Sequence, residues 1–453
     1  MTDHGERDAA HTPVTTEAVP LFGEDFGGDP HALYERLRRE WGPVAPVLLV
    51  PGLPAWLILG YYEVVGVCRA SRLFSRDTRL WADLRDGHAP PGTAVPAGLL
   101  YRPGLAFAEG DEHTRLRRCL TDALERLDPA STMRHTQEIA EELIDAFSPE
   151  GRGDLVGQYA RLLPPYVLAR LLGVPENGIG RFVAAVTHEE AAPHPGSPGS
   201  GDALGRELAA LVQARREEPT EDLTSWLVGH PAALPDEAVT SVLHTVLRRG
   251  DGPTADLLSG ALRRLVHGRE PGSAEAARGL DVEDAIDEVL WTDPPVQNGA
   301  ARVPTHDALL GRAEIVAGDL MLMGIAAANA DPVLGRGTTG PGVSGRSGRR
   351  AHLAWGAGPY RCPAQRLARQ IASVGAGVLL SRLTGLRLEV PPERLERRAS
   401  PLAPGLDALP VLFEPAPANA ARRAAPVVEP AFAEPDPEPE FVNPFRQSWW
   451  HHS

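Results

Sequence analysis

The stretch from residue 351 to residue 369, AHLAWGAGPYRCPAQRLAR, constrains the fold more than any other part of the 453-residue chain. Its pattern is typical of a glycine-rich loop that carries Cys362 to the start of a helix. Gly356 and Gly358 permit sharp backbone turns, and Pro363 suits the first helical position. Apolar residues then recur at helical spacing and predict a buried helix face: Leu367, Ile371, Val374 and Val378.

A cysteine at a helix start has surroundings that favour its thiolate form. The N-terminal end of a helix is partially positive and presents free N–H groups, both of which lower the pKa of a thiol. The thiolate is the form of sulfur that binds metals. The residues alone leave a second interpretation of Cys362 open, namely a buried structural cysteine that caps the helix.

The whole pattern resembles the haem-thiolate signature of the cytochromes P450. Residues 355–362, WGAGPYRC, end at Cys362, and LAR follows at residues 367–369, as in that family. Trp355 stands where the family commonly has Phe, and Ala364 stands where it commonly has Gly. The resemblance implies that Cys362 is the axial ligand of the iron in haem b. It also implies that the segment around it binds the haem through His352, Trp355, Gly356 and Gly358.

Composition limits the function further. The net charge of −15 argues against a nucleic-acid surface, which needs clustered Lys and Arg. Three cysteines in so long a chain do not suggest a disulfide framework. The N-terminal residues lack the apolar core of a signal peptide, and no apolar run approaches the roughly 20 residues that span a bilayer. We therefore expect a cytoplasmic protein without a membrane span.

The resemblance covers residues 19–415 and implies a mainly α fold with a small β region, the cytochrome P450 fold. Residues 1–18 are polar and aperiodic, and residues 416–453 are rich in Pro, Ala and Glu, so we expect both to be disordered. The tail ends in exposed aromatic residues, which leaves open whether it docks a protein partner. Two segments rich in Gly and Pro, 83–104 and 188–202, are expected to be loops near the substrate pocket.

Periodicity predicts the main elements of the remaining chain. Helices are expected at 29–39, 62–70, 112–127, 282–291 and after Cys362. Short apolar runs at 47–50 and 55–59 predict a hairpin, and residues 320–325 predict a strand after a turn. Alternating residues in 386–413 predict a terminal sheet.

Three basic residues are candidates for binding the haem propionates. His113 and Arg117 lie four residues apart on a predicted helix, so they share one face and suit a carboxylate. Spacing alone leaves a solvated basic surface as the alternative. The family has an HxxxR pair at the corresponding place, and the resemblance assigns both residues to the propionates. It assigns Arg302 to them as well.

The predicted central helix has an unusual middle. Residues 236–248 and 255–266 are helical, and we expect a kink or break at Pro253, which removes one backbone donor. The family usually has Ala-Gly-x-acid-Thr here, and its acid and alcohol deliver protons during oxygen activation. In this chain Gly252 and Pro253 stand in those two places. Asp251 and Thr254 are each one position away, and we expect them to substitute only if the kink turns them inward.

A second departure lies in the helix 282–291, which resembles the ExxR helix of the family. Glu288 stands in the Glu position, and Trp291 stands where the family has Arg. A buried, unpaired Glu288 would cost about 3–5 kcal/mol. We therefore expect it to be protonated, hydrogen-bonded elsewhere or exposed. This ExxW form resembles a lineage of actinobacterial P450s that lacks the arginine.

Taken together, the residues and the resemblance favour a monooxygenase that oxidises a small organic molecule with electrons from a ferredoxin and its ferredoxin reductase. Arginines near 345–350 and 361–369 are candidates for docking the acidic ferredoxin. The missing acid–alcohol pair predicts atypical oxygen activation, including peroxide-driven or poorly coupled turnover. The alternative is a haem-binding regulatory or assembly protein associated with a GTPase-like signalling system. A fold that no longer retains haem is a third hypothesis.

Overall fold

The computed structural model describes residues 18–23, 26, 29–90, 93, 95–191, 203–269, 279–334 and 351–417. The predicted disordered N-terminus lies outside these residues except for residue 18, and the predicted tail lies outside them beyond residue 417. The basic segment 345–350 and residues 192–202 of one predicted loop also lie outside the described residues.

Helices dominate the described chain, as the sequence predicts. In chain order they are α3 (Pro30–Trp41), α4 (Tyr61–Arg69), α5 (Ala82–Arg85), α6 (Gly110–Glu125), α7 (Pro129–Asp145), α8 (Leu163–Leu171), α9 (Ile179–Ala191), α10 (Ala203–Glu217), α11 (Leu223–Val228), α12 (Asp236–His267), α13 (Val282–Thr292), α14 (Ile325–Asn329) and α15 (Gln365–Arg382). A π-helical turn, η5 (Val156–Ala160), precedes α8, and a short 3₁₀ turn, η9 (Gly358–Tyr360), precedes Cys362.

The β region is small. Its main sheet has the order β1 (Val19–Pro20), β2 (Val44–Val50), β3 (Leu53–Ile58), β9 (Met321–Gly324), β6 (Asn298–Pro304) and β4 (Phe74–Ser75). The predicted hairpin is β2–β3, in antiparallel register with Val47 opposite Ala55. β10 (Arg387–Leu388), β11 (Pro410–Leu412) and β5 (Arg152–Asp154) form the predicted terminal sheet, and β7 (Ala308–Leu310) pairs with β8 (Ala313–Ile315).

The predicted helix at 29–39 shows how local sequence sets these elements. Asp29 caps α3, because its side chain accepts a hydrogen bond of 3.0 Å from the backbone N–H of Ala32. Pro30 occupies the first turn, where no backbone donor is lost. Leu33 and Leu37 then point into the core beside the main sheet. This prediction is confirmed.

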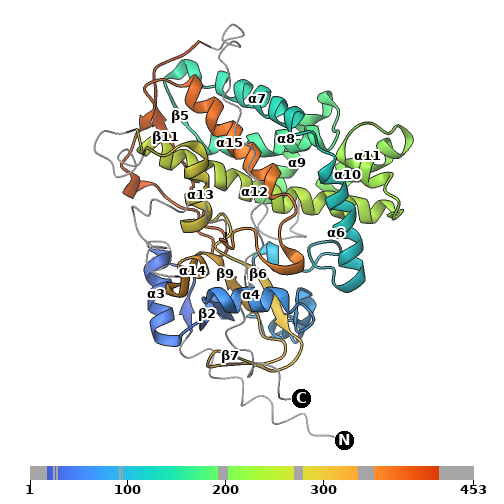
Figure 1. The fold of residues 1–453 in the computed structure, drawn as a ribbon, viewed down its shortest axis with the longest axis vertical. Helices are drawn as coiled ribbons and strands as arrows, with labels where there is room; N and C mark the ends of the chain where they lie inside the picture. Colours follow the sequence, from blue (N-terminus) through green and yellow to red (C-terminus); the bar gives the residue numbers. More distant parts are fainter. Residues whose placement is uncertain are drawn as a thin grey trace, which may run out of the picture.

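The helical part surrounds α12 and α15, which pack against each other, while the main sheet lies at the other end of the molecule with α3, α4 and α14 (Figure 1). The predicted buried face of α15 is confirmed, since Ile371 and Val374 are 1% and 3% exposed. α13 and α8 also pack on α12, so this long helix lies at the centre of the largest hydrophobic cluster.

Three local predictions differ from the structure. Of the kink or break expected at Pro253, the break is absent, because α12 runs without interruption from Asp236 to His267. The buried residues that follow the proline pack against α13 and α15, and this packing offsets the lost backbone bond. The first residues of the predicted loop 188–202 are helical instead, because α9 continues to Ala191. In the sequence, the first proline after this helix is Pro193. Finally, Pro363 lies before α15, which begins at Gln365.

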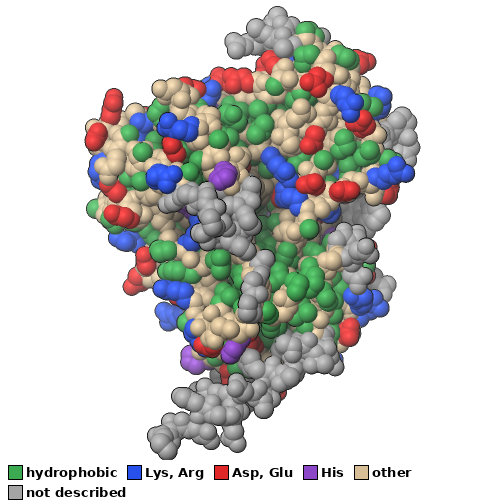
Figure 2. All heavy atoms as spheres, turned by 180° about the vertical axis from the view of Figure 1, so that it is seen from behind, with side chains coloured by type: hydrophobic (Ala, Val, Ile, Leu, Met, Phe, Trp, Pro, Cys, Tyr) green, Lys and Arg blue, Asp and Glu red, His purple; other side chains and the backbone are tan. Residues whose placement is uncertain are grey.

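The outer surface carries both signs of charge. Figure 2 shows Lys and Arg side chains interspersed with Asp and Glu on one face, with hydrophobic side chains gathered over its lower half. Across the described ranges, no helix combines the length and the apolar character that a membrane span requires.

Candidate functional site

The loop before α15 holds Cys362 in a fixed backbone frame. Gly356 and Gly358 have φ angles of +76° and +67°, in the left-handed region that favours glycine. A Cβ atom on Gly358 would lie 2.7 Å from the carbonyl oxygen of Cys68, so the loop passes closely over the end of α4. The backbone N–H of Cys362 donates to the carbonyl of Trp355 at 2.8 Å and closes the loop.

Cys362 lies just before α15, which begins at Gln365, and its side chain is half-buried. Burial raises the pKa of this thiol, against the opposing effects of the Ala364 N–H and of Arg117 and Arg361. A further positive charge would favour the thiolate, and a coordinated metal ion would supply one.

A cluster of basic side chains surrounds the ring of Tyr360, two residues before the cysteine. The ring of His113 lies 4.1 Å from the Tyr360 ring, between centroids. The guanidinium carbons of Arg76 and Arg302 lie 4.8 Å and 5.2 Å from the same centroid. The Tyr360 hydroxyl donates to the carbonyl of Ala108 at 3.0 Å. These contacts bring β4, β6, α6 and the cysteine loop together.

Arg302 and Arg76 lack a carboxylate partner among the described residues. Arg302 is 1% exposed, yet its Nη1 atom donates only to the carbonyls of Ala300 and Ala301, at 3.1 and 3.0 Å. The Nε atoms of both arginines are buried without a partner. Burial, followed by Arg302 and Arg249, holds the pKa of Arg76 well below its usual range. Two neighbouring guanidiniums, one buried and one half-buried, without a carboxylate partner among the described residues fit a group with two carboxylates, as the haem propionates are.

The backbone of β6 aims Arg302 at this cluster. The register of β6 against β9 shifts between Gly299 and Arg302, and Ala300 has a φ of +52°, a costly value for a residue with a side chain. A bulge of this kind redirects the side chains that follow it.

The two propionate candidates on α6 differ in character. His113 is 6% exposed, and burial, followed by Arg117, Arg76 and Arg302, lowers its pKa to about 4. It is therefore a neutral donor near neutral pH. Arg117 is half-buried, and its Nη1 atom reaches the carbonyl of Pro359 in the cysteine loop at 3.5 Å. Both residues face the cysteine loop rather than bulk solvent.

His352 and Trp355 lie on the α13 side of the cysteine loop. The His352 ring is 5.7 Å from the Trp291 ring in an edge-to-face arrangement, and its Nδ1 atom accepts from the Ala354 N–H at 3.3 Å. Trp355 packs partly buried against the main hydrophobic cluster. Asn329 joins these parts, because its amide donates to the carbonyl of Leu290 and accepts from the Leu353 N–H.

Glu288 faces a cation from another helix. Its carboxylate lies 3.9 Å from Nε of Arg264 on α12, and its side chain is 24% exposed. Arg264 also donates to Thr292 at 2.8 Å, and burial, with the nearby Arg263, lowers its pKa to about 10. Glu288 is thus both partly exposed and near a cation, so it is not an isolated buried charge. Trp291, at the position where the resemblance leads us to expect an arginine, is 6% exposed.

Helix α12 presents two different stripes at its centre. Asp251 and Thr254 are 2% and 4% exposed and share a stripe with the core residues Leu247 and Leu258. The adjoining stripe lines a cavity and contains Ser241, His244, Thr245, Arg248 and Arg249. At helical spacing this second stripe continues to the half-buried Gly252 and Pro253. The unbroken helix therefore does not bring Asp251 and Thr254 onto the cavity side.

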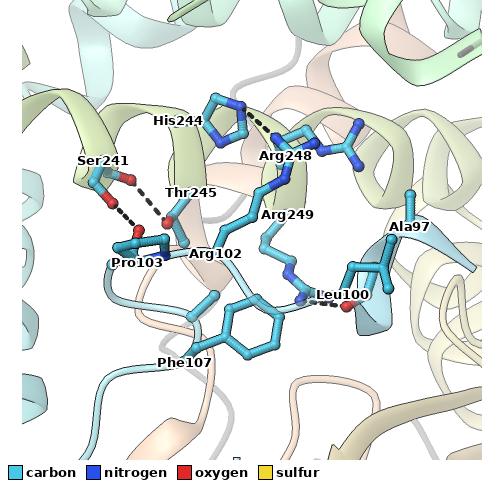
Figure 3. A pocket seen from close by; sticks show the side chains of 13 residues that line it. Ala97, Leu100, Arg102, Pro103, Phe107, Ser241, His244, Thr245, Arg248 and Arg249 are labelled. Carbon is cyan, nitrogen blue, oxygen red and sulfur yellow. Dashed lines mark hydrogen bonds between the residues drawn. The ribbon is translucent and has the colours of Figure 1, made fainter. Parts of the chain in front are cut away.

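The cavity lies between α12 and the segment 97–107 of the predicted loop (Figure 3). Its space, including the open mouth, is about 520 Å³. Arg102 reaches across it, with Nη1 3.3 Å from Nε2 of His244. Ser241 donates to the carbonyl of Pro103 at 2.8 Å and fixes the loop to the helix.

Sequence reasoning missed Arg76 and Tyr360 in the cluster and Arg249 in the cavity. Tyr360 lies inside the cysteine motif, so its position was a usable signal. Arg76 belongs to no motif and reaches the cluster only because β4 pairs with β6.

Known proteins are similar to this chain over most of its length. No family model matches the chain. It is 30% identical over 412 residues to the cytochrome P450 monooxygenase PikC of Streptomyces venezuelae, covering 88% of this chain and 95% of that relative. It is 32% identical over 410 residues to nocardicin C N-oxygenase of Nocardia uniformis subsp. tsuyamanensis, covering 89% and 100%. Such relatives do not favour the regulatory alternative.

Solved structures agree with the sequence relatives. The ligand-free P450 monooxygenase TamI superposes with a TM-score of 0.73 at 28% identity, covering 88% of this chain and 94% of that one. The myxobacterial cytochrome P450 CYP267B1, solved in complex with myristic acid, gives 0.73 at 28%, covering 87% and 98%. The chain therefore belongs to the cytochrome P450 family and has the P450 fold.

Proposed function

We propose that this protein is a haem-thiolate monooxygenase that oxidises a small organic molecule, with Cys362 as the axial ligand of haem b. The observation that carries the proposal is the pair of guanidiniums beside the cysteine loop, buried Arg302 and half-buried Arg76, without a carboxylate partner among the described residues. A bound dianionic group would balance these charges.

The chain's own residues have distinct tasks in binding. Arg302 and Arg76 neutralise the propionates, and His113 and Arg117 add hydrogen-bond donors from α6. The loop of Gly356 and Gly358 positions the sulfur, as its closing bond from Cys362 to Trp355 suggests. When bound, the haem supplies oxygen activation, which the thiolate promotes by donating electron density.

Proton delivery is the unusual part of the proposed reaction. Gly252 and Pro253 continue the cavity stripe of α12 and offer no side-chain donor. Asp251 and Thr254 lie on the adjoining core stripe, so a proton from either residue has to pass through water or a change in α12. We propose that turnover is poorly coupled for this reason, or that it uses peroxide.

The double substitution Gly252→Asp with Pro253→Thr tests this proposal. It restores an acid and an alcohol on the cavity stripe, so the fraction of consumed NADH that yields product should rise several-fold, with less peroxide released. The matched control is Arg312→Gln, on the β7–β8 turn, which leaves α12 unchanged. The proposal fails if the restored pair leaves the coupling at the wild-type level.

We also propose that a ferredoxin, reduced by its reductase, supplies the electrons. Arg366 is exposed in the first turn of α15, close to Cys362 in the chain, and suits an acidic partner. Arg369, predicted to share this patch, is instead 4% exposed and bonds Asp287 at 2.6 Å. Arg366→Glu should raise the KM for ferredoxin at low salt, whereas Arg312→Glu, on the distant β7–β8 turn, should not. Equal effects would contradict this docking site.

A small-molecule substrate agrees with the relatives. The similar proteins include nocardicin C N-oxygenase and a P450 solved in complex with myristic acid, and both ligands are small organic molecules. A cytoplasmic location and a protein-docking role for the tail stay predictions.

A further inference from the structure

We propose that Arg249 is the specificity-determining residue of the cavity and that it pairs with a carboxylate group on the substrate. This inference rests on the proposed function, because it names the class of molecule that the oxidation site receives. Arg249 lies one helical turn before Gly252 and Pro253, on the stripe of α12 that lines the cavity. Figure 3 places its side chain across the cavity, toward the loop at Leu100.

The hydrogen bonding of Arg249 leaves most of its donors for a ligand. Within the part of the chain that the structure describes, its guanidinium has one partner, the carbonyl oxygen of Gly98, which accepts from Nη2 at 3.2 Å. A guanidinium carries five N–H donors in a planar fork that matches both oxygens of a carboxylate. The bond to Gly98 holds one edge of the fork and orients the rest.

Arg249 lies beside a second cation. Its side chain is exposed and lines the cavity. Desolvation by the neighbouring protein atoms, followed by the charge of Arg248, lowers the pKa of Arg249. A carboxylate in the cavity would offset the repulsion from Arg248.

The other ionisable side chains that line the cavity are also basic. The described lining residues include three more basic side chains, Arg102, His244 and Arg248, and no acidic side chain. Those three side chains also have other interactions. Arg249 therefore makes the direct contact with the carboxylate, and its neighbours add to the positive field. Leu100 and Phe107 supply apolar contacts for the carbon skeleton of the ligand.

A binding measurement on the haem-loaded protein tests the proposal without turnover. Isothermal titration calorimetry would compare three acids with their neutral amides: decanoate with decanamide, phenylacetate with phenylacetamide, and cyclohexanecarboxylate with its amide. The wild type should bind at least one acid about tenfold or more tightly than its amide. Arg249→Leu should abolish this preference, Arg249→Lys should retain part of it, and Arg312→Leu should leave it unchanged.

Two outcomes would overturn the proposal. One is a wild type that shows no preference for any acid over its amide. The other is an Arg249→Leu variant that keeps the preference for the acid. If that variant also loses haem, Arg249 serves the haem rather than the substrate. A normal haem-thiolate spectrum alongside either result would leave the proposed oxygenase function standing, so the two failures are distinguishable.

Discussion

At the scale of single residues, buried charges determine what the site can bind. Arg302 lies 1% exposed behind a backbone bulge, and Arg76 reaches the same Tyr360 ring from another strand. A protein tolerates two such cations together only if something compensates their charge. Their positions support the proposed propionate site independently of the cysteine motif.

Arg302→Gln should weaken haem binding. Hydrogen bonds to charged groups contribute about 1.5–3 kcal/mol, which corresponds to roughly a ten- to hundredfold faster loss of haem. The rate of haem transfer to apomyoglobin measures this loss. Arg312→Gln, an exposed arginine on the β7–β8 turn, is the matched control. A variant that retains haem as well as the control would rule out Arg302 as a propionate partner.

Asp256 should make stability depend on pH. Burial raises its pKa to about 6, although Arg398 bonds its carboxylate at 2.6 and 2.7 Å. Because the folded pKa lies above the unfolded value of 3.8, folding favours the protonated form. That contribution is complete below pH 3.8 and is lost as the pH rises through 6.

Asp256→Asn removes this titration. Between pH 4 and 6 the stability of the variant should rise relative to the wild type, by up to about 3 kcal/mol. Thermal unfolding across this range measures the difference. Asp407→Asn, at a side chain that is 59% exposed, should track the wild type. A constant difference between wild type and Asp256→Asn would show that Asp256 does not titrate in this window.

At the scale of elements, α13 shows how the fold manages without the usual arginine. Glu288 faces Arg264 of α12, and Arg369 of α15 bonds Asp287 at 2.6 Å and Glu283 at 3.0 Å. The ion pairs that join these helices thus use cations from α12 and α15. Trp291 packs its ring edge-to-face against the ring of His352.

Trp291→Arg should therefore destabilise the protein rather than repair it. The substitution removes a buried ring and places a second cation near Arg264, for a loss of about 2–4 kcal/mol. Urea unfolding followed by circular dichroism measures this loss. Trp291→Phe keeps a ring beside His352 and should lose less. An arginine variant more stable than the wild type would mean that Glu288 still lacks a cation.

At the scale of the whole molecule, the order of motifs predicted the fold well. Asp29 and Pro30 marked α3, and the glycine-rich loop placed Cys362 before α15, because caps and turns depend on neighbouring residues. The break predicted at Pro253 is absent, because tertiary packing on both sides keeps α12 helical. Arg76 and Arg264 could not be predicted as parts of the site, because the pairing of distant elements alone gives them their neighbours.

The absorption spectrum of the reduced protein under carbon monoxide tests the central claim most directly. We predict a red-shifted Soret band in the wild type and in Arg312→Gln, and its loss in Cys362→Ala, because only a thiolate ligand produces that shift. A purified protein without haem, or a band that does not depend on Cys362, would contradict the haem-thiolate site.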